Sequence, residues 1–148
     1  MKRPEPDAQQ IAARSAQALY ARDRASQALG MRLLEVRPGR ARVVMTVRPD
    51  MLNGHDVCHG GMVFALADSA FAFACNSYNE STVAAAAAID FLAAARAGDE
   101  LTAAASELWR TRRNGIYEIE VTNQRGERVA LFRGRSYRID GQVTKIEE

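Results

Sequence analysis

One acidic residue stands alone in the most apolar stretch of the chain. Asp68 lies in the segment from Gly61 to about Ser77, where Met, Val, Phe, Ala and Leu occupy nearly all of the remaining positions. Burying an ionised carboxylate is costly unless the group is paired or used in a reaction. We therefore expect the chemistry of this protein at Asp68. The structural alternative is a carboxylate that is satisfied by backbone groups or by serine hydroxyls.

The segment His59-Gly60-Gly61 comes directly before this apolar stretch and opens a predicted helix. Glycines allow a ligand to approach the backbone, and the free N–H groups of a first helical turn attract negative charge. The carbonyl oxygen of a thioester becomes an oxyanion on attack, and such donors typically stabilise it by about 2.7 to 4 kcal/mol each. Alternatively, the two glycines only form the corner between a strand and the helix.

The spacing of these two features restricts how they can act together. Asp68 follows Gly60 by eight residues, which is ~12 Å along a helix axis. A base and an oxyanion donor must both lie roughly 3 Å from the reacting group. The Gly60 amide and Asp68 of one protomer therefore cannot serve the same carbonyl. If both act, they come from two copies with antiparallel helices across a two-fold axis, which predicts a site shared at a dimer interface.

The loop before the helix carries further polar side chains. Asn53 could hold a water molecule or a carbonyl, but Asn-Gly is also an ordinary turn pair. By chemical type, His55 and His59 could be general bases, and His59 could equally orient the turn. Cys58 next to His59 looks like a thiol and its base, yet adjacent residues rarely point at one another. We do not expect a cysteine nucleophile.

The remaining sequence predicts the elements that position these residues. Residues 7 to 27 form a weakly amphipathic helix that caps the fold. Two strands flank the turn pair Pro38-Gly39, and four strands follow the apolar helix, with Asn114-Gly115 as the strongest hairpin signal. The predicted strands cover Leu33 to Val36, Ala41 to Val47, Thr82 to Leu92, Glu100 to Thr111, Ile116 to Asn123 and Arg128 to Ile139.

These elements predict an α+β fold in which an antiparallel sheet curls around one buried helix. The helix is apolar on every face, which is typical of a helix enclosed by other structure. A chain of 148 residues suits a single domain. We expect this domain to span residues 1–148, with a core at about 29–139 and an N-terminal helix and tail over 1–28.

Composition restricts the partners and the compartment. No stretch approaches the ~18 apolar residues of a membrane span, and no secretory signal is present, so we expect a cytoplasmic protein with Cys58 and Cys75 as free thiols. Two Cys and two His are too few for a metal site, and a net charge of +2 argues against general nucleic-acid binding. Residues 109–138 nevertheless hold eight arginines against three glutamates. These arginines could bind a phosphorylated ligand or lie on solvated strand faces.

Six motifs of the chain can be compared with those of known families. They are Asn53 to His55, Cys58 to Gly61, Leu66 to Ala72, Ile89 to Leu92, Ala97 to Asp99 and Phe132 to Arg138. Together they resemble the hotdog-fold phenylacetyl-CoA thioesterases of the bacterial phenylacetate degradation pathway, and the resemblance spans about residues 29 to 139. It implies a sheet wrapped around a central helix, dimers that pair into a homotetramer, and hydrolysis of acyl-CoA thioesters such as phenylacetyl-CoA and its hydroxylated relatives. It implies no metal or organic cofactor.

The resemblance also assigns roles by motif. Asn53 would orient substrate or water, His59 would support the loop or contact the thioester, and the Gly60 amide would polarise the carbonyl. Asp68 of the partner subunit would be the general base or the nucleophile. Some relatives place a Ser or Thr hydroxyl on the strand that faces the helix, whereas this chain offers Val83 and a run of alanines there. A water molecule held by a hydroxyl is therefore in doubt.

Substrate contacts are expected on the same helix and on the last strand. Gly61, Met62, Phe64 and the partner's Phe71 or Ser69 are candidates for the acyl pocket. The candidates for the CoA phosphates are Arg110, Arg112, Arg113, Arg133 and Arg135. Two other functions stay open: a non-catalytic acyl-CoA-binding module, which would not need Asp68, and an enoyl-CoA hydratase, which would need a His paired with a carboxylate.

Overall fold

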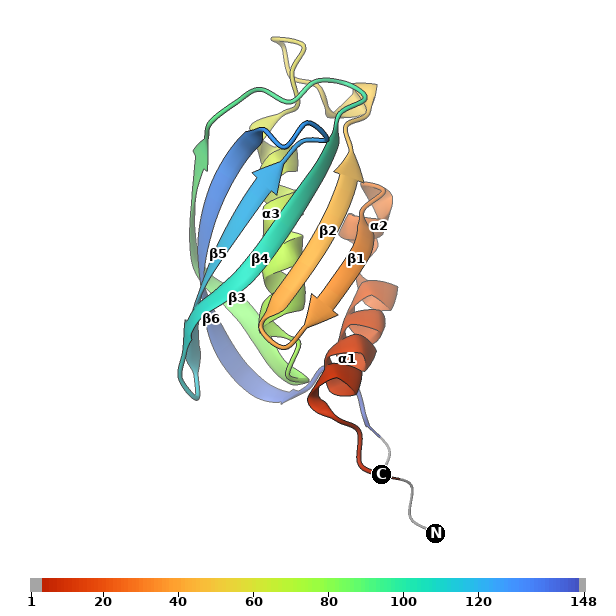
Figure 1. The fold of residues 1–148 in the computed structure, drawn as a ribbon, viewed down its shortest axis with the longest axis vertical. Helices are drawn as coiled ribbons and strands as arrows, with labels where there is room; N and C mark the ends of the chain where they lie inside the picture. The colour runs from red at the N-terminus through yellow and green to blue at the C-terminus, as the bar shows by residue number, and fades with distance from the viewer. Residues whose placement is uncertain (1–3, 147–148) are drawn as a thin grey trace.

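A computed structural model describes residues 4–146 as one six-stranded antiparallel sheet with a long helix against one face (Figure 1). The strand order is β1-β2-β4-β5-β6-β3. The helices are α1 (Ala8–Arg22), α2 (Arg24–Ala28) and α3 (Gly60–Cys75), with a 3₁₀ turn at Pro49–Met51. The strands are β1 (Arg32–Arg37), β2 (Arg40–Thr46), β3 (Glu80–Phe91), β4 (Glu100–Arg110), β5 (Asn114–Thr122) and β6 (Arg128–Gln142).

Helix α3 forms the core with the concave face of the sheet. Leu66, Ala67, Ala70 and Ala74 are fully buried, and the small side chains of the three alanines allow the sheet to approach the helix closely. The Phe71 ring lies against Gly134 of β6, where a Cβ atom would come within 2.7 Å of the ring. The prediction of a sheet curled around one helix is confirmed. Asp68 and its neighbour Ser69 lie on a face that this chain covers only in part.

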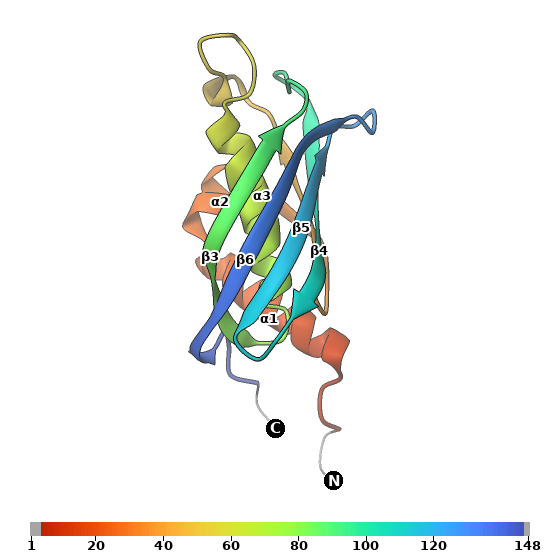
Figure 2. The same cartoon turned by 90° about the vertical axis from the view of Figure 1, so that its left-hand side faces the viewer.

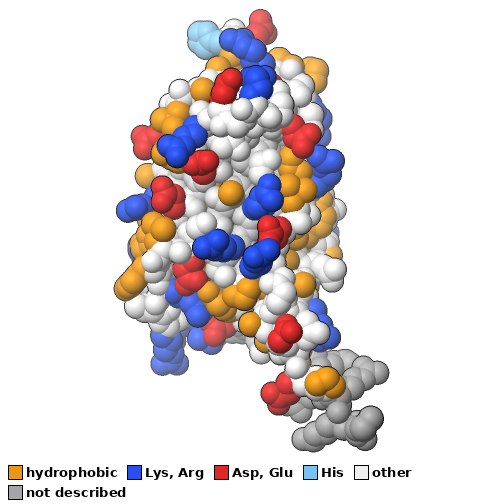
Figure 3. All heavy atoms as spheres, in the orientation of Figure 1, with side chains coloured by type: hydrophobic (Ala, Val, Ile, Leu, Met, Phe, Trp, Pro, Cys, Tyr) orange, Lys and Arg blue, Asp and Glu red, His pale blue; other side chains and the backbone are white. Residues whose placement is uncertain are grey.

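The outer face of the sheet is wet. Side chains alternate between the buried inner face and this surface, as in β5, where Tyr117 and Ile119 point inward and Glu118 is exposed. Figure 3 shows basic and acidic side chains interleaved over this face. Several of these side chains form ion pairs, such as that between Arg128 Nε and Glu120 Oε2, which are 3.1 Å apart. Arginines and glutamates on solvated strand faces are what the alternating pattern predicts.

The two edges of the sheet differ. Strand β3 is twelve residues long and pairs only with β6, so its other edge is free within residues 4–146 (Figure 2). Residues 83–88 of this strand are exposed. At the opposite edge, β1 has a bulge between Leu33 and Glu35, helix α1 lies beside it, and Gln9 Nε2 donates to Val36 O at 2.8 Å. Among the described residues, the β3 edge is therefore the one more open to another strand.

Two sequence predictions were wrong in their local detail. The predicted helix over residues 7 to 27 breaks at Asp23, because the Asp23 carboxylate accepts from Ser26 N–H at 2.9 Å and starts α2. The pair Asn114-Gly115 lies inside β5, and residues 111–113 form the turn, with Thr111 N–H donating to Asn114 O at 2.7 Å. Gly115 is required for packing, since a Cβ there would lie 2.7 Å from the Tyr117 ring.

Candidate functional site

The loop that enters α3 holds Asn53 in a fixed orientation. Its side-chain oxygen accepts from His55 N–H at 2.9 Å, and its own N–H donates to Val57 O at 2.8 Å. The side-chain NH₂ group of Asn53 donates to no atom of residues 4–146. Because Asn53 lines a cavity at this end of the helix, its amide is a donor that a ligand can use.

The backbone amides that lead into α3 have acceptors, with one exception. Cys58 N–H donates to Ala95 O at 2.7 Å and His59 N–H donates to Met51 O at 2.8 Å. Gly61 N–H donates to His59 Nδ1 at 2.9 Å. In the part of the chain that the structure describes, the Gly60 N–H has no acceptor. Neighbouring donors are thus satisfied while one, at the positive end of the helix, is left for a ligand.

Asn53 and Gly60 line the same cavity of about 420 Å³. Its other walls are apolar, with Val63 from α3 and Phe91 from the end of β3 among them. The Phe91 ring covers Gly60 closely, since a Cβ on that glycine would lie 3.0 Å from the ring. Two hydrogen-bond donors in an apolar cavity can stabilise negative charge that develops on a carbonyl oxygen.

Cys58 also lines this cavity. Burial raises the pKa of its thiol, which keeps the sulfur protonated and weakens it as a nucleophile. His59 cannot activate it through Nδ1, because this nitrogen accepts from Gly61. A Cys58 nucleophile would thus have no activating base at His59 Nδ1.

Asp68 lies in a second cavity, of about 330 Å³, that contains neither Asn53 nor Gly60. No donor in residues 4–146 reaches its carboxylate, so no backbone or serine group in this range satisfies it by a hydrogen bond. Burial, and secondarily the charge of Asp23, raise the pKa of Asp68. A carboxyl group with a raised pKa accepts a proton more readily than an ordinary aspartate.

Asp23 and Thr82 also line the Asp68 cavity, and neither was predicted from the sequence as a site residue. Asp23 lines it from the junction of α1 and α2, and Thr82 lines it from β3. The spacing of Asp23 and Ser26 is a helix-start signal that could have located the junction. Thr82 supplies a hydroxyl on the strand beside the helix, although its Oγ1 donates to Glu80 O at 2.8 Å.

The candidates for the acyl pocket are spread over α3. Met62 and Phe64 pack against the core, and the Phe64 ring meets the edge of Phe132 with centroids 5.1 Å apart. Phe71 is buried and lines the Asp68 cavity. The Ser69 hydroxyl lies 2.8 Å from Ser26 Oγ, between α3 and α2. His55 is exposed at the tip of the loop.

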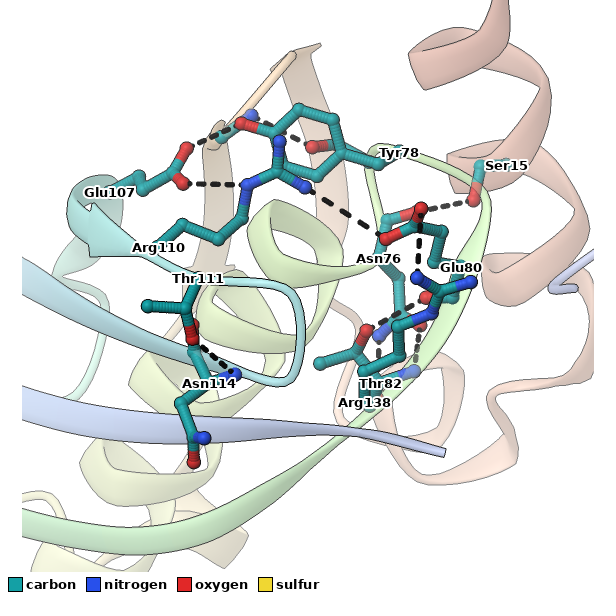
Figure 4. Close-up of polar contacts among 12 residues, drawn as sticks. Ser15, Asn76, Tyr78, Glu80, Thr82, Glu107, Arg110, Thr111, Asn114 and Arg138 are labelled. Carbon is teal, nitrogen blue, oxygen red and sulfur yellow. Dashed lines mark hydrogen bonds and ion pairs between the residues drawn. The ribbon is translucent and has the colours of Figure 1, made fainter. Parts of the chain in front are cut away.

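Many of the arginines in residues 109–138 are paired with carboxylates. Figure 4 shows Arg110 between Glu107 and Glu80, and Arg138 on the other oxygen of Glu80. The Arg110 Nε to Glu107 Oε1 distance is 3.1 Å, and the Arg138 Nη1 to Glu80 Oε1 distance is 3.3 Å. Within the described residues, the arginines without a carboxylate partner are Arg112, Arg113, Arg133 and Arg135.

The same end of the molecule holds a tyrosine that does not titrate near neutral pH. Tyr78 donates to Glu107 Oε2, and the Arg110 guanidinium lies 3.5 Å from the centre of its ring (Figure 4). Burial and the Glu107 carboxylate raise the pKa of Tyr78 to about 12. This cluster fastens the end of α3 to β4.

Residues 4–146 contain neither a cluster of metal-binding side chains nor a membrane-spanning helix. No group of three or more His, Cys, Asp or Glu side chains lies close enough together to hold a metal ion. No helix in this range is long and apolar enough to cross a membrane.

The chain is similar in sequence to known proteins. Residues 55–130 match the family described as the Thioesterase superfamily. The chain is 49% identical over 130 residues to the acyl-coenzyme A thioesterase PaaI of Escherichia coli, covering 88% of this chain and 93% of the relative.

Solved structures give the same result. The structure of the E. coli PaaI protein from the phenylacetic acid degradation operon superposes with a TM-score of 0.91 at 47% identity, covering 92% of this chain and 99% of the other. A mutant of the phenylacetic acid degradation protein PaaI of Thermus thermophilus superposes with a TM-score of 0.76 at 40% identity, covering 79% and 100%. A hypothetical thioesterase of Streptococcus pneumoniae, solved with coenzyme A, has a TM-score of 0.72 at 25% identity, covering 76% and 87%.

Proposed function

Because the chain belongs to the thioesterase superfamily, we propose that it hydrolyses acyl-CoA thioesters to a free acid and CoA. The E. coli relative is an acyl-coenzyme A thioesterase, and the related S. pneumoniae protein was solved with coenzyme A. Two relatives belong to phenylacetic acid degradation. We therefore infer a phenylacetyl or hydroxyphenylacetyl group as the acyl part of the substrate, and the apolar cavity walls at Val63 and Phe91 suit such a ring.

The observation that carries this proposal is the unused Gly60 N–H, which shares an apolar cavity with the Asn53 amide. The thioester carbonyl oxygen would accept from one or both donors. A water molecule would then attack the carbonyl carbon, while one of its protons passes to Asp68 of the partner subunit. The C–S bond would break, and the CoA thiolate would take up the proton held by Asp68, which returns Asp68 to its ionised form. The raised pKa of Asp68 supports the role of general base over that of nucleophile, because a base must end the step protonated.

The shared site requires a dimer, and the open edge of β3 supports one. If β3 pairs with the partner's β3 about a two-fold axis, the sheet continues across two copies and the two α3 helices run antiparallel. The exposed alanines of residues 84–88 would let the two strands meet without steric conflict. This arrangement would bring the Gly60 cavity of one protomer to the Asp68 cavity of the other. We further expect two such dimers to form a tetramer, with exposed Leu108 and Trp109 as candidates for the second contact.

We also assign the phosphates of CoA to the arginines that lack a carboxylate partner in the described chain. Arg133 and Arg135 are both exposed on β6, next to the small side chains of Ala86 and Ala88 in the paired register of β3. An arginine that is not already neutralised by a carboxylate is the better ligand for a phosphate. The two buried free thiols are compatible with the reducing conditions of the cytoplasm, where we expect the enzyme to act.

Complementation between two inactive variants tests the shared site. Asn53→Ala removes a donor from the loop, and Asp68→Ala removes the acid, so each homodimer should lose hydrolysis of phenylacetyl-CoA. In a mixed dimer, one site holds both defects and the other is intact. Refolding the two variants together at equal amounts should therefore restore about a quarter of the wild-type sites. Free thiol released from phenylacetyl-CoA measures this recovery.

Each outcome of this experiment has a definite meaning. Recovery near a quarter supports a site built from two protomers. No recovery, with mixed dimers confirmed by mass spectrometry, would contradict the sharing of the site. A wild-type protein that binds phenylacetyl-CoA but releases no CoA would be a binding module, and the proposed function would be wrong.

A further inference from the structure

We propose that Asp23 is a positioning residue for the reaction, because its fixed negative charge in the Asp68 cavity promotes the uptake of a proton by Asp68. This inference rests on the proposed function, in which Asp68 is the general base. Asp23 lies at the junction between α1 and α2, far from α3 in sequence, and both acids line one cavity.

Asp23 is held rigidly by α2. Its Oδ1 atom accepts from Ser26 N–H at 2.9 Å, and its Oδ2 atom accepts from Ser26 Oγ at 2.5 Å. Ser26 is 1% exposed and its Oγ lies 2.8 Å from Ser69 Oγ, on the residue next to Asp68 in α3. A chain of hydrogen bonds thus connects the Asp23 carboxylate to the helix that carries Asp68.

The two carboxylates differ in their hydrogen bonds. Both oxygens of Asp23 accept, whereas no donor in residues 4–146 reaches Asp68. Hydrogen bonds to the charged form of a carboxylate favour ionisation, and burial without them disfavours it. A proton that enters the cavity is therefore expected on Asp68, whose oxygens accept no hydrogen bond from residues 4–146. Two acids in different environments with divided roles are a recurrent catalytic arrangement.

No cation in the described part of the chain neutralises this pair. Arg22 lines the cavity, but its Nη2 atom donates to Val143 O at 2.9 Å and neither acid lies within ion-pair distance of it. The Cys75 thiol, the other titratable group of the cavity, is neutral because burial raises its pKa to about 12. The lining residues from β3 are uncharged. In the proposed dimer, His59 of the partner subunit would also approach from the Gly60 side.

This arrangement has a chemical consequence for the proposed step. The attacking water loses an O–H bond as its oxygen bonds to the carbonyl carbon, and the proton goes to an Asp68 oxygen. An ordinary aspartate is a weak base for this transfer. The desolvation of Asp68, its largest perturbation, and the negative charge of Asp23, its second, both favour the protonated product. In this proposal Asp23 increases the basicity of Asp68 without itself accepting the proton of the attacking water.

The substitution Asp23→Asn tests the proposal with little change of shape. Asparagine can still accept from Ser26 N–H and begin α2, but it carries no charge. We would follow the ¹³C carboxyl resonance of Asp68 with pH in the substrate-free protein, and separately measure the pH profile of kcat/KM for phenylacetyl-CoA. The Asp68 midpoint should move to lower pH, the acid limb of the profile should move with it, and the plateau should fall by about two- to fivefold.

Two matched variants complete the test. Arg22→Gln removes a positive charge from the same cavity and should not move the Asp68 midpoint to lower pH, because loss of a cation does not favour an ionised carboxylate. Asp23→Glu restores the charge and should return the titration toward that of the wild type. An Asp68 titration that is identical in wild type and Asp23→Asn would overturn the proposal. So would an equal shift in Arg22→Gln.

The titration needs no substrate, so the two claims fail separately. Normal hydrolysis with an unchanged titration would overturn the role of Asp23 alone. A shifted titration in a protein that hydrolyses no acyl-CoA would overturn the proposed function, and with it the role of Asp23 in catalysis.

Discussion

His59 Nδ1 accepts a hydrogen bond from the Gly61 N–H at 2.9 Å, and this contact closes the first turn of α3. A neutral imidazole has one acceptor nitrogen, so the bond leaves Nε2 as the donor. The His59 ring thereby caps the helix and fixes the peptide that carries the Gly60 N–H. The role of His59 as a support for the loop, one of the two that the resemblance implied, has a direct structural basis.

Substitution of His59 should separate capping from contact with the substrate. His59→Ala removes the cap and should cost about 0.5–2 kcal/mol of unfolding free energy. His59→Asn supplies another favoured cap and should keep most of that stability. Urea unfolding measures both variants. If His59 only positions the loop, the asparagine variant keeps kcat within about tenfold of wild type; a stable but inactive asparagine variant would show that Nε2 contacts the thioester.

Removal of the Asp68 charge should abolish most of the activity. A general base typically contributes 10²–10⁴-fold, so Asp68→Asn should lower kcat by about that factor while KM changes little. Stopped-flow or steady-state release of CoA checks this. Unchanged turnover in a correctly folded Asp68→Asn protein would disprove the assignment of Asp68.

The same substitution should stabilise the fold at neutral pH. The pKa of Asp68 is raised in the folded protein, so the folded state binds more protons than the unfolded state above the ordinary value of 3.8. The stability of wild type therefore falls as pH rises from that value through the folded pKa. Asp68→Asn removes this loss and should unfold at higher urea at pH 7. The advantage should shrink as pH is lowered, and a variant less stable at pH 7 would contradict the raised pKa.

Packing around Phe71 makes Gly134 intolerant of a side chain. A Cβ atom on Gly134 would lie 2.7 Å from the Phe71 ring, which is buried between Tyr117 and Phe132. Gly134→Ala should cost about 1–3 kcal/mol by overpacking. Gly54→Ala is the matched control, because nothing lies within 4 Å of the added atom. Equal unfolding midpoints for the two variants would show that the core yields there.

A charge on β3 should prevent dimerisation and activity together. Ala86 is exposed on the free-edge strand, opposite Arg135 of β6. Ala86→Glu can pair locally with Arg135, but in a β3–β3 dimer it brings two like charges near the two-fold axis. Light scattering should show a smaller assembly than that of the wild type, and hydrolysis should be lost because each site needs two protomers joined through β3. Ala104→Glu on the central strand β4 is the control, and an Ala86→Glu protein that keeps the wild-type assembly and activity would exclude this interface.

Periodicity predicted most of the fold because the inner and outer faces differ clearly in polarity. The alternation around Tyr117 and Ile119, and the apolar length of α3, both follow from burial. The turn at residues 111–113 could not be predicted in this way. Gly115 looks like a turn residue in the sequence. In the folded sheet, however, glycine is needed there because the Tyr117 ring leaves no space for a side chain.

Site residues that lie close together in the sequence could be predicted, whereas a contact between residues far apart in the sequence could not. Gly60 and Asp68 stand out because their types contrast with their neighbours, and their spacing already showed that the two residues of one protomer cannot serve the same carbonyl. The approach of Asp23 to Asp68 depends on how α2 packs on α3 through Ser26 and Ser69. No pattern within residues 7 to 27 reports that contact.

The bulge in β1, and the helix beside it, determine how far this protein can extend its sheet. A chain with two open edges could add copies without end and form a fibril. Here two features obstruct the β1 edge. The Gln9 side-chain amide donates to the Val36 carbonyl, and the bulge between Leu33 and Glu35 makes the strand irregular. Joining two copies through β3 would therefore leave a twelve-strand sheet with a blunted strand at each end, so growth stops after a single addition.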